Sequence, residues 1–224
     1  MGFVPTEWQE MRVKDICKEK NVRSVEGKEP HLSMSQKKGL VTDDDDITRP
    51  FLSESYIGGK VCNENDLVLN RLKAHLGVFA LAPQLGVVSP DYTVLKINMN
   101  RIIPKYAEYL LKCNSCRKEL TTRVKGITEG FWRLYTEDLY SIRICIPSIA
   151  EQSQILAAIK EKEDLVKSAV LMIQKEIELI TEYKKTLISN VVTGQVDVQD
   201  VEVPEYETVE LSDTDSDVEA EAEG

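Results

Sequence analysis

The stretch SIAEQSQILAAIKEKEDLVKSAVLMIQKEIELITEYKKTLISNVVTG, residues 148–194, decides the fold of this chain. Ser148 and Glu151 have the spacing of a capping box, in which each side chain bonds the backbone N–H of the other at a helix start. No glycine or proline follows before Gly194. We therefore predict one helix of about 45 residues, which is roughly 67 Å long.

Apolar residues recur every seven positions along this helix, as in a coiled coil. The two series that form the predicted dimerisation seam are Ile159, Val166, Ile173, Ile180 and Leu187, and Leu156, Glu163, Val170, Ile177, Lys184 and Val191. A seam of five heptads needs a partner helix, and residues 1–147 contain no helix of comparable length. The expected partner is a second copy of the chain.

Two charged residues within the seam favour an antiparallel homodimer. In a parallel, in-register dimer Glu163 would face its own copy, and so would Lys184, which places like charges together. In an antiparallel dimer centred between residues 173 and 174, Glu163 lies level with the partner's Lys184. A two-fold dimer of this kind would hold one N-terminal domain at each end.

Residues 1–147 alternate short β-like runs with turn residues, which predicts a β-rich domain. The runs cover residues 61–70, 78–81 and 92–97. A last strand is predicted near residues 142–146, where isoleucine alternates with arginine and cysteine before Pro147.

One helix is predicted within this domain, starting at Pro104, because proline suits a first helical position. Tyr106, Tyr109, Leu110 and Cys113 then share one face at helical spacing. The expected fold class is α+β: a mixed β-rich domain over residues 1–147, a long coiled-coil helix over 148–194 and a disordered acidic tail over 195–224.

The net charge of −10 belongs to the tail, since residues 200–224 hold eleven acidic residues and no lysine or arginine. The remaining residues carry 28 basic and 27 acidic side chains. No apolar run approaches the ~18 residues of a membrane span, and the N-terminus has no signal-peptide core. We expect a cytoplasmic protein without a membrane partner, whose five cysteines are reduced.

Catalytic chemistry is poorly supported, and we assign no catalytic residue, metal ligand or cofactor. The chain has only two histidines, His31 and His75, and no nucleotide-binding glycine motif. Cys113 and Cys116 form a lone C-x-x-C pair without the further ligands that zinc needs. We interpret the pair as helix residues, with thiol chemistry as the alternative.

Basic and polar residues in the predicted loops of residues 1–147 are candidate DNA contacts. Arginine and lysine bind phosphates and guanine edges, while histidine and threonine supplement base contacts. Taken as composition alone, a solvated surface would be the better explanation of these residues. The candidates are Lys37, Lys38, Arg71, Lys73, His75, Arg123, Lys125, Thr128 and Arg133.

The end of the domain and the helix resemble the specificity subunits of type I restriction-modification systems. The resemblance rests on residues 142–152 (IRICIPSIAEQ), 182–188 (EYKKTLI) and 192–198 (VTGQVDV). The family has Pro-Pro-Leu before Glu-Gln, whereas this chain has Pro147 followed by Ser, Ile and Ala. The family's target recognition domain is also similar to upstream parts of this chain, namely Trp8, Gly77 and residues 13–16, 65–69, 88–95 and 126–139.

This resemblance implies a non-catalytic subunit that binds half of a two-part sequence in double-stranded DNA. The family implies methyltransferase subunits and a restriction/translocase subunit as partners. Its members carry two recognition domains and two helices, whereas this chain has one of each and resembles a half-length form. The alternatives are a truncated or silent recognition-domain cassette, and a DNA-binding coiled-coil adaptor unrelated to restriction.

Overall fold

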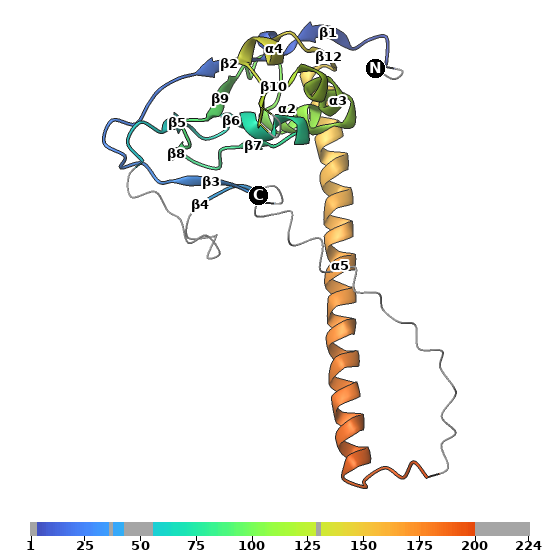
Figure 1. The fold of residues 1–224 in the computed structure, drawn as a ribbon. Coiled ribbons are helices and arrows are strands. Elements are labelled where there is room, and N and C mark those ends of the chain that lie inside the picture. The colour runs from blue at the N-terminus through green and yellow to red at the C-terminus, as the bar shows by residue number, and fades with distance from the viewer. Residues whose placement is uncertain (1–3, 36–37, 43–55, 129–130, 200–224) are drawn as a thin grey trace. The chain divides into compact units, whose positions relative to one another are not determined.

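The structure is a computed structural model that describes residues 4–35, 38–42, 56–128 and 131–199. The chain divides into two units, residues 1–164 and 165–224. The described elements are, in chain order, β1 (Gln9–Arg12), α1 (Val13–Ile16), β2 (Cys17–Lys20), β3 (Leu32–Ser35), β4 (Gly39–Thr42), β5 (Lys60–Cys62), β6 (Leu67–Asn70), the 3-10 helix η2 (Arg71–Leu76), β7 (Phe79–Leu81), β8 (Gly86–Val88), β9 (Tyr92–Ile97), α2 (Pro104–Lys112), α3 (Asn114–Arg123), β10 (Lys125–Thr128), β11 (Phe131–Arg133), α4 (Thr136–Tyr140), β12 (Arg143–Ile146) and α5 (Ile149–Val192) (Figure 1).

A four-stranded antiparallel sheet, in the order β2-β9-β6-β7, forms the centre of the first unit. Both faces are buried, since successive side chains of a strand point to opposite faces. Leu67 and Leu69 pack with residues of α2, α3, α4 and β12, whereas Val68 packs with residues of β3, β4, β5 and β8. This two-sided burial explains why residues 67–69 are continuously apolar.

Four further strand pairs are antiparallel: β1–β12, β3–β4, β5–β8 and β10–β11. Strand β12 confirms the predicted last strand. Ile144 and Ile146 are only 2% and 3% exposed, while Arg143 is exposed to solvent. The period-2 pattern identified this strand because one of its faces covers the core.

Helix α5 confirms the predicted long helix, and its 44 residues extend about 66 Å. The Oγ of Ser148 accepts from the N–H of Glu151 at 3.3 Å, as predicted. The prediction that the Glu151 side chain bonds the backbone N–H of Ser148 is wrong. The Glu151 carboxylate instead accepts from Nε1 of Trp8 at 3.0 Å, because the N-terminal segment brings an indole donor within its reach.

The first turn of α5 is tied to the domain by a buried glutamine. Gln152 is 0% exposed, and its Oε1 accepts from the backbone N–H of Ile103 at 2.9 Å. Its Nε2 donates to the carbonyls of Arg101 at 3.2 Å and Pro147 at 3.0 Å. One side chain therefore joins the start of α5 to the segment that leads into α2.

Two predictions about local structure are corrected. The described part of residues 1–147 contains four α-helices instead of one, because α1 and α4 are too short for a periodic signal and α3 has little amphipathic character. The run 61–70 is two strands separated by a turn, in which Asn65 has φ 65° and the Asp66 carboxylate accepts from the N–H of Asn63.

The predicted face of the helix that begins at Pro104 is also only partly right. Tyr106 is buried, but the other fully buried apolar residues of α2 are Ala107 and Leu111, and Cys113 lies beyond the helix end. The helix therefore turns a face toward the core that is rotated from the predicted one.

Three further predictions concern the acidic tail, membrane-spanning helices and metal sites. The acidic tail from residue 200 onward lies outside the described residues. Within the described ranges, none of the helices is long and apolar enough to cross a membrane. The same ranges hold no cluster of three or more histidine, cysteine or acidic side chains that suits a metal ion.

Candidate nucleic-acid interface

The 3-10 helix η2 presents three of the predicted contact residues, and both of its ends are capped. The Asn70 side chain accepts from the N–H of Leu72 at 3.1 Å and of Lys73 at 3.3 Å. At the other end Gly77 has φ 69°, a left-handed conformation that glycine adopts without strain. Arg71, Lys73 and His75 are thus held on a short, fixed turn after β6.

The hairpin β10–β11 lies beside η2. The N–H of Leu134 donates to the carbonyl of Arg71 at 3.2 Å. In the hairpin, Lys125 is paired with Arg133. These contacts bring residues that are far apart in the sequence to one place on the first unit.

A cluster of charges forms where these elements meet, and we call it the arginine cluster. Its members are Arg23, Lys60, Arg71 and Arg133 with the carboxylates Glu19 and Asp91, so four positive charges face two negative ones. Asp91 lies between the two main arginines. Its carbonyl accepts from Nε of Arg71 at 2.9 Å, and its Oδ1 is 3.5 Å from Nη2 of Arg133.

The pKa shifts in the arginine cluster reflect burial on one side and neighbouring charges on the other. Burial, followed by the nearby Arg133, lowers the pKa of Arg71, while the carboxylates of Glu19 and Asp91 oppose the shift. Burial also lowers the pKa of Lys60, although Glu19 opposes this at an Nζ–Oε1 distance of 3.2 Å. Burial would raise the pKa of Glu19, but hydrogen bonds from Thr136 and Lys60 bring it below its usual value.

These side chains divide into a structural pair and exposed cations. The Lys60 side chain is 4% exposed and is engaged by Glu19, so it supports the site from beneath. The Arg133 side chain is 31% exposed. Among the described residues, Nε of Arg133 and Nδ1 of His75 are buried without a hydrogen-bond partner.

Two other predicted contacts lie beside the cluster but are engaged within the domain. Arg123 bonds the carboxylate of Glu119 and the hydroxyl of Ser141, so its guanidinium joins α3 to the end of α4. Lys125 is 2.9 Å from Oδ2 of Asp138, with its Nζ 5.6 Å from the ring of Tyr135. Lys125 is still 63% exposed and can reach a ligand.

The remaining predicted contacts are less informative. Thr128 is the last residue of β10. Lys38 is exposed just before β4 and lines a hollow with Lys105 and Glu108, which shares no lining residue with the arginine cluster. Lys37 lies outside the described residues.

The sequence prediction missed four members of the cluster: Arg23, Lys60, Glu19 and Asp91. Arg23 and Lys60 are brought together by an isolated β-bridge between their backbones. Glu19 and Asp91 matter because they position the cations. No periodicity marks any of them, since their proximity arises only from strand pairing.

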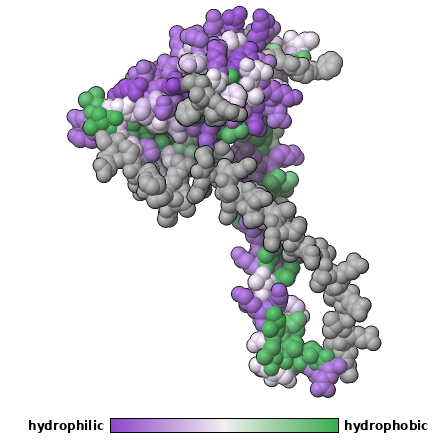
Figure 2. Space-filling model, viewed as in Figure 1, coloured by the Kyte–Doolittle hydropathy of each residue, from purple (hydrophilic) through white to green (hydrophobic). Residues whose placement is uncertain are grey.

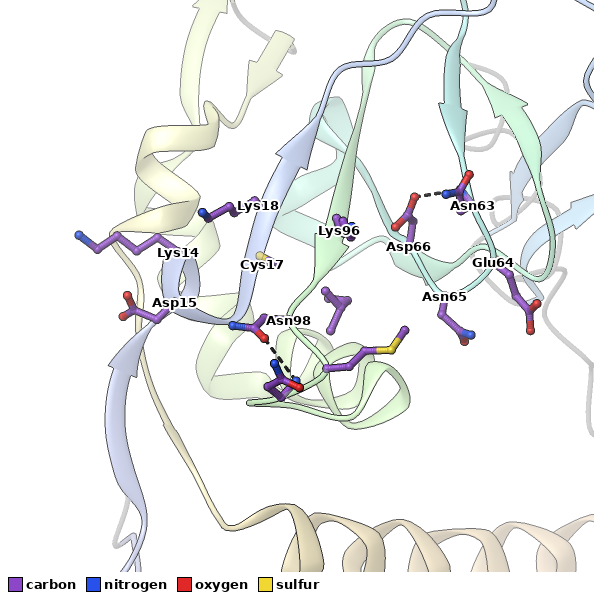
Figure 3. A pocket seen from close by; sticks show the side chains of 13 residues that line it. Lys14, Asp15, Cys17, Lys18, Asn63, Glu64, Asn65, Asp66, Lys96 and Asn98 are labelled. Atoms are coloured by element: carbon purple, nitrogen blue, oxygen red, sulfur yellow. Dashed lines mark hydrogen bonds between the residues drawn. The ribbon is translucent and has the colours of Figure 1, made fainter.

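A separate hollow of about 650 Å³ opens near the start of β2 and the end of β9 (Figure 3). Its charged lining residues are Lys14, Lys18, Lys96, Asp15, Glu64 and Asp66, so their charges cancel. Asp66 is engaged by the N–H of Asn63 at 2.8 Å and by Lys20 at 3.1 Å. This balance gives the hollow no preference for an anionic ligand.

The predicted dimerisation residues fall into two groups along α5. Leu156 and Ile159 are half-buried, and Leu156 packs against the core of the first unit. The Glu163 carboxylate accepts from the Tyr109 hydroxyl at 2.6 Å, and burial and this carboxylate raise the pKa of Tyr109 to about 12. The start of the predicted seam is therefore already in contact with its own domain.

Beyond residue 164 the apolar seam is open to solvent. The exposed apolar members are Val166, Val170, Ile173, Ile177, Ile180 and Leu187. Lys184 is also exposed, and Val191 is half-buried. Figure 2 shows that hydrophobic side chains gather along the C-terminal part of the helix.

Comparisons with known proteins agree on one family. Residues 5–179 match the model of the type I restriction modification DNA specificity domain. The type I restriction enzyme MjaVIII specificity subunit of Methanocaldococcus jannaschii is 23% identical over 206 residues. This alignment covers 86% of the chain but 44% of that relative, so the chain spans about half its length.

Two solved structures share the fold. One concerns the complex assembly and conformational transition of a type I restriction-modification system, with a TM-score of 0.56 and 16% identity over 84% of this chain and 46% of that one. The other is the S subunit of a type I restriction-modification system from M. genitalium, with a TM-score of 0.51 and 17% identity over 84% of this chain and 48% of that one.

Proposed function

The chain belongs to the type I restriction modification DNA specificity family, and we propose that it is a specificity subunit that binds half of a two-part DNA target. The observation that carries this proposal is the family match over residues 5–179. This match includes both the arginine cluster and most of helix α5. Specificity subunits recognise DNA and leave catalysis to other subunits, so the chain is assigned no reaction of its own.

DNA contact is assigned to the surface around η2 and the β10–β11 hairpin. The excess of two positive charges attracts the phosphate backbone, which supplies most sequence-independent affinity. Arg71 and Arg133 are supported by Asp91, so their guanidinium groups are aimed before DNA binds. Lys73 is exposed on the same turn and adds a flexible phosphate contact.

The experiment selects bound duplexes from a random double-stranded library with the full chain and measures their affinity at several salt concentrations. Arg71→Ala and Arg133→Ala should each weaken binding by about 1 to 3 kcal/mol. Loss of a base contact should relax specificity at one position of the target. Loss of a phosphate contact should weaken binding to all duplexes and reduce the salt slope by about one.

Arg143→Ala is the matched control. Arg143 lies on β12, its side chain is 65% exposed, and its partner is Glu10. Removing it should leave DNA affinity unchanged. Equal losses for all three arginine variants, or no loss at Arg71 and Arg133, would show that the arginine cluster is not the interface.

The second part of the proposal is an antiparallel homodimer through α5. The exposed apolar seam from Val166 to Leu187 supports it, because a stripe of this length in water marks a contact surface. Glu163 already accepts from Tyr109 through Oε1, but a carboxylate has further acceptor sites for the partner's Lys184. The dimer would supply two recognition domains and hence an inverted target with an unread spacer.

Sedimentation velocity of charge-swapped variants tests the orientation. Glu163→Lys should weaken dimerisation about tenfold, since two pairs, each worth ~0.2 to 1 kcal/mol, become repulsive. The double variant with Lys184→Glu should recover it. Tyr109→Phe is the control, because it removes only the hydrogen bond within the chain. Cross-linking of residue 163 to the partner's residue 163 would exclude the antiparallel arrangement.

The third part concerns partners. We assign to the chain the docking of type I methyltransferase subunits, with a restriction/translocase subunit in the full complex. Adenine methylation should appear only when such a methyltransferase subunit is added to the chain, and single-molecule sequencing of the product DNA would give the motif. Methylation by the purified chain alone would contradict the proposal. Stable assembly with no DNA selectivity would favour the adaptor alternative.

A further inference from the structure

Cys113 and Cys116 lie where two helices of the first unit meet, and the proposed function makes no use of them. Cys113 ends α2, with its N–H donating to the carbonyl of Leu110 at 3.2 Å. It also begins α3, with its carbonyl accepting from the N–H of Arg117 at 2.9 Å. The backbone of Cys113 is therefore held from both sides, and Cys116 follows in the first turn of α3.

The two thiols differ in their exposure to solvent. Cys113 is half-buried, whereas Cys116 is 5% exposed and belongs to the core of the first unit. Cys113 occupies the N-cap position of α3 and makes no side-chain cap hydrogen bond in the reduced structure. Cys113 and Cys116 are three residues apart across the first turn of α3, so their side chains lie on the same side of the helix.

This geometry stabilises a thiolate at Cys113. The Cys116 thiol and the N–H groups at the start of α3 lower the pKa of Cys113 to about 6, despite partial burial. Donation to Cys113 together with burial raises the pKa of Cys116. The fully buried cysteines behave differently, because burial raises the pKa of Cys17 to about 12 and of Cys62 to about 11.

We propose that Cys113 and Cys116 form a redox-active dithiol that undergoes exchange with low-molecular-weight disulfides. The accessible Cys113 thiolate attacks one sulfur of the disulfide, forms a mixed disulfide and releases one thiolate. Cys116 then loses its proton and attacks the Sγ of Cys113, which releases the second thiolate. The pair is oxidised to an internal disulfide, and the external disulfide is reduced to two thiols.

The oxidised pair would lie in the helix that supports η2. The Arg117 side chain lies against Gly77, where an added Cβ would be 2.9 Å from its Cγ. The Thr121 hydroxyl is 3.5 Å from the carbonyl of His75. The dithiol is thus connected to the candidate DNA surface through one helix, although the exchange reaction does not depend on DNA binding.

Alkylation of the reduced, full-length chain gives the first test. At pH 7 a thiol with a pKa of about 6 is mostly thiolate, whereas an unperturbed thiol with a pKa of about 8.5 is ~3% thiolate. The lower nucleophilicity of the more acidic thiol offsets about tenfold of this ~30-fold advantage. Iodoacetamide should therefore modify Cys113 about threefold faster than an unstructured model peptide whose single thiol has that ordinary pKa. Equal or slower modification of Cys113 would overturn the proposal.

Oxidised glutathione gives the second test, with peptide mapping by mass spectrometry. The native chain should form a Cys113–Cys116 cross-link, which lacks two hydrogen atoms. Cys116→Ser should instead accumulate glutathione on Cys113, and Cys113→Ser should take up none at the buried Cys116. Circular dichroism confirms that the variants fold. Glutathione on Cys145 but not on Cys113, or a native chain that forms no cross-link, would show that the pair is only structural.

Discussion

Replacement of Gln152 by alanine should greatly weaken the first unit. The side chain is 0% exposed and makes three hydrogen bonds to backbone groups, one of them fully buried. Each hydrogen bond makes a net contribution of about 1 kcal/mol to the free energy of unfolding, and a buried polar group left without a partner costs about 1 to 3 kcal/mol. We expect Gln152→Ala to lower the free energy of unfolding by about 3 to 4 kcal/mol, measured by urea denaturation and circular dichroism.

Gln154→Ala is the matched control, since Gln154 lies in the same turn of α5 but is exposed. Its free energy of unfolding should change by less than about 0.5 kcal/mol. Similar values for the two variants would refute the argument, because the loss would then not depend on the buried hydrogen bonds of Gln152.

Gln152→Glu separates hydrogen bonding from packing. The carboxylate keeps an acceptor for the N–H of Ile103 but faces the carbonyl oxygens of Arg101 and Pro147. This repulsion raises the carboxyl pKa of the folded variant above the unfolded value of about 4.5, so the penalty is complete above the folded pKa and is lost as the pH falls from there to about 4.5. The variant should approach the native stability near pH 4; a pH-independent deficit would indicate a packing defect.

Three further outcomes are expected from unfolding measurements. The folded protein lowers the pKa of Glu19, so the ionised carboxylate stabilises the fold above the unfolded value of about 4.5, and this contribution is lost as the pH falls. Glu19→Gln should remove this acid dependence. It should also lower the free energy of unfolding by about 2 kcal/mol at pH 7, because Lys60 then stays buried without its carboxylate partner. Trp8→Phe removes the bond to Glu151 and should cost about 1 kcal/mol. Gly77→Ala forces a left-handed alanine and should cost about 1 to 2 kcal/mol, whereas an unchanged stability would mean that the turn relaxes.

Much of the fold could be predicted from the sequence where a pattern repeats over enough residues. The heptads predicted 148–194 and the helix covers Ile149–Val192, and the alternating isoleucines predicted β12. The short helices α1 and α4 offer no such repeat. The partner of Glu151 was also inaccessible, because it depends on where the distant Trp8 lies in the folded chain.

The candidate site was predictable by residue type but not by arrangement. Arg71 and Arg133 were chosen because arginines in loops suit DNA, and nothing in the sequence indicated that Asp91 would join them. Lys60 is not among the predicted contacts, because nothing about a lysine beside a glycine pair indicates that its side chain is buried. Long-range strand pairing creates such neighbours, and single-sequence patterns carry little information about it.

The two caps of η2 have a consequence for how such a protein can evolve. Asn70 and Gly77 fix the turn through a side-chain acceptor and a backbone conformation, and neither depends on the side chains between them. Within residues 71–76 only Ala74 is buried. The other positions can therefore change by point mutation without disturbing strands β6 and β7, so the charge and shape of this surface can change while the scaffold is kept.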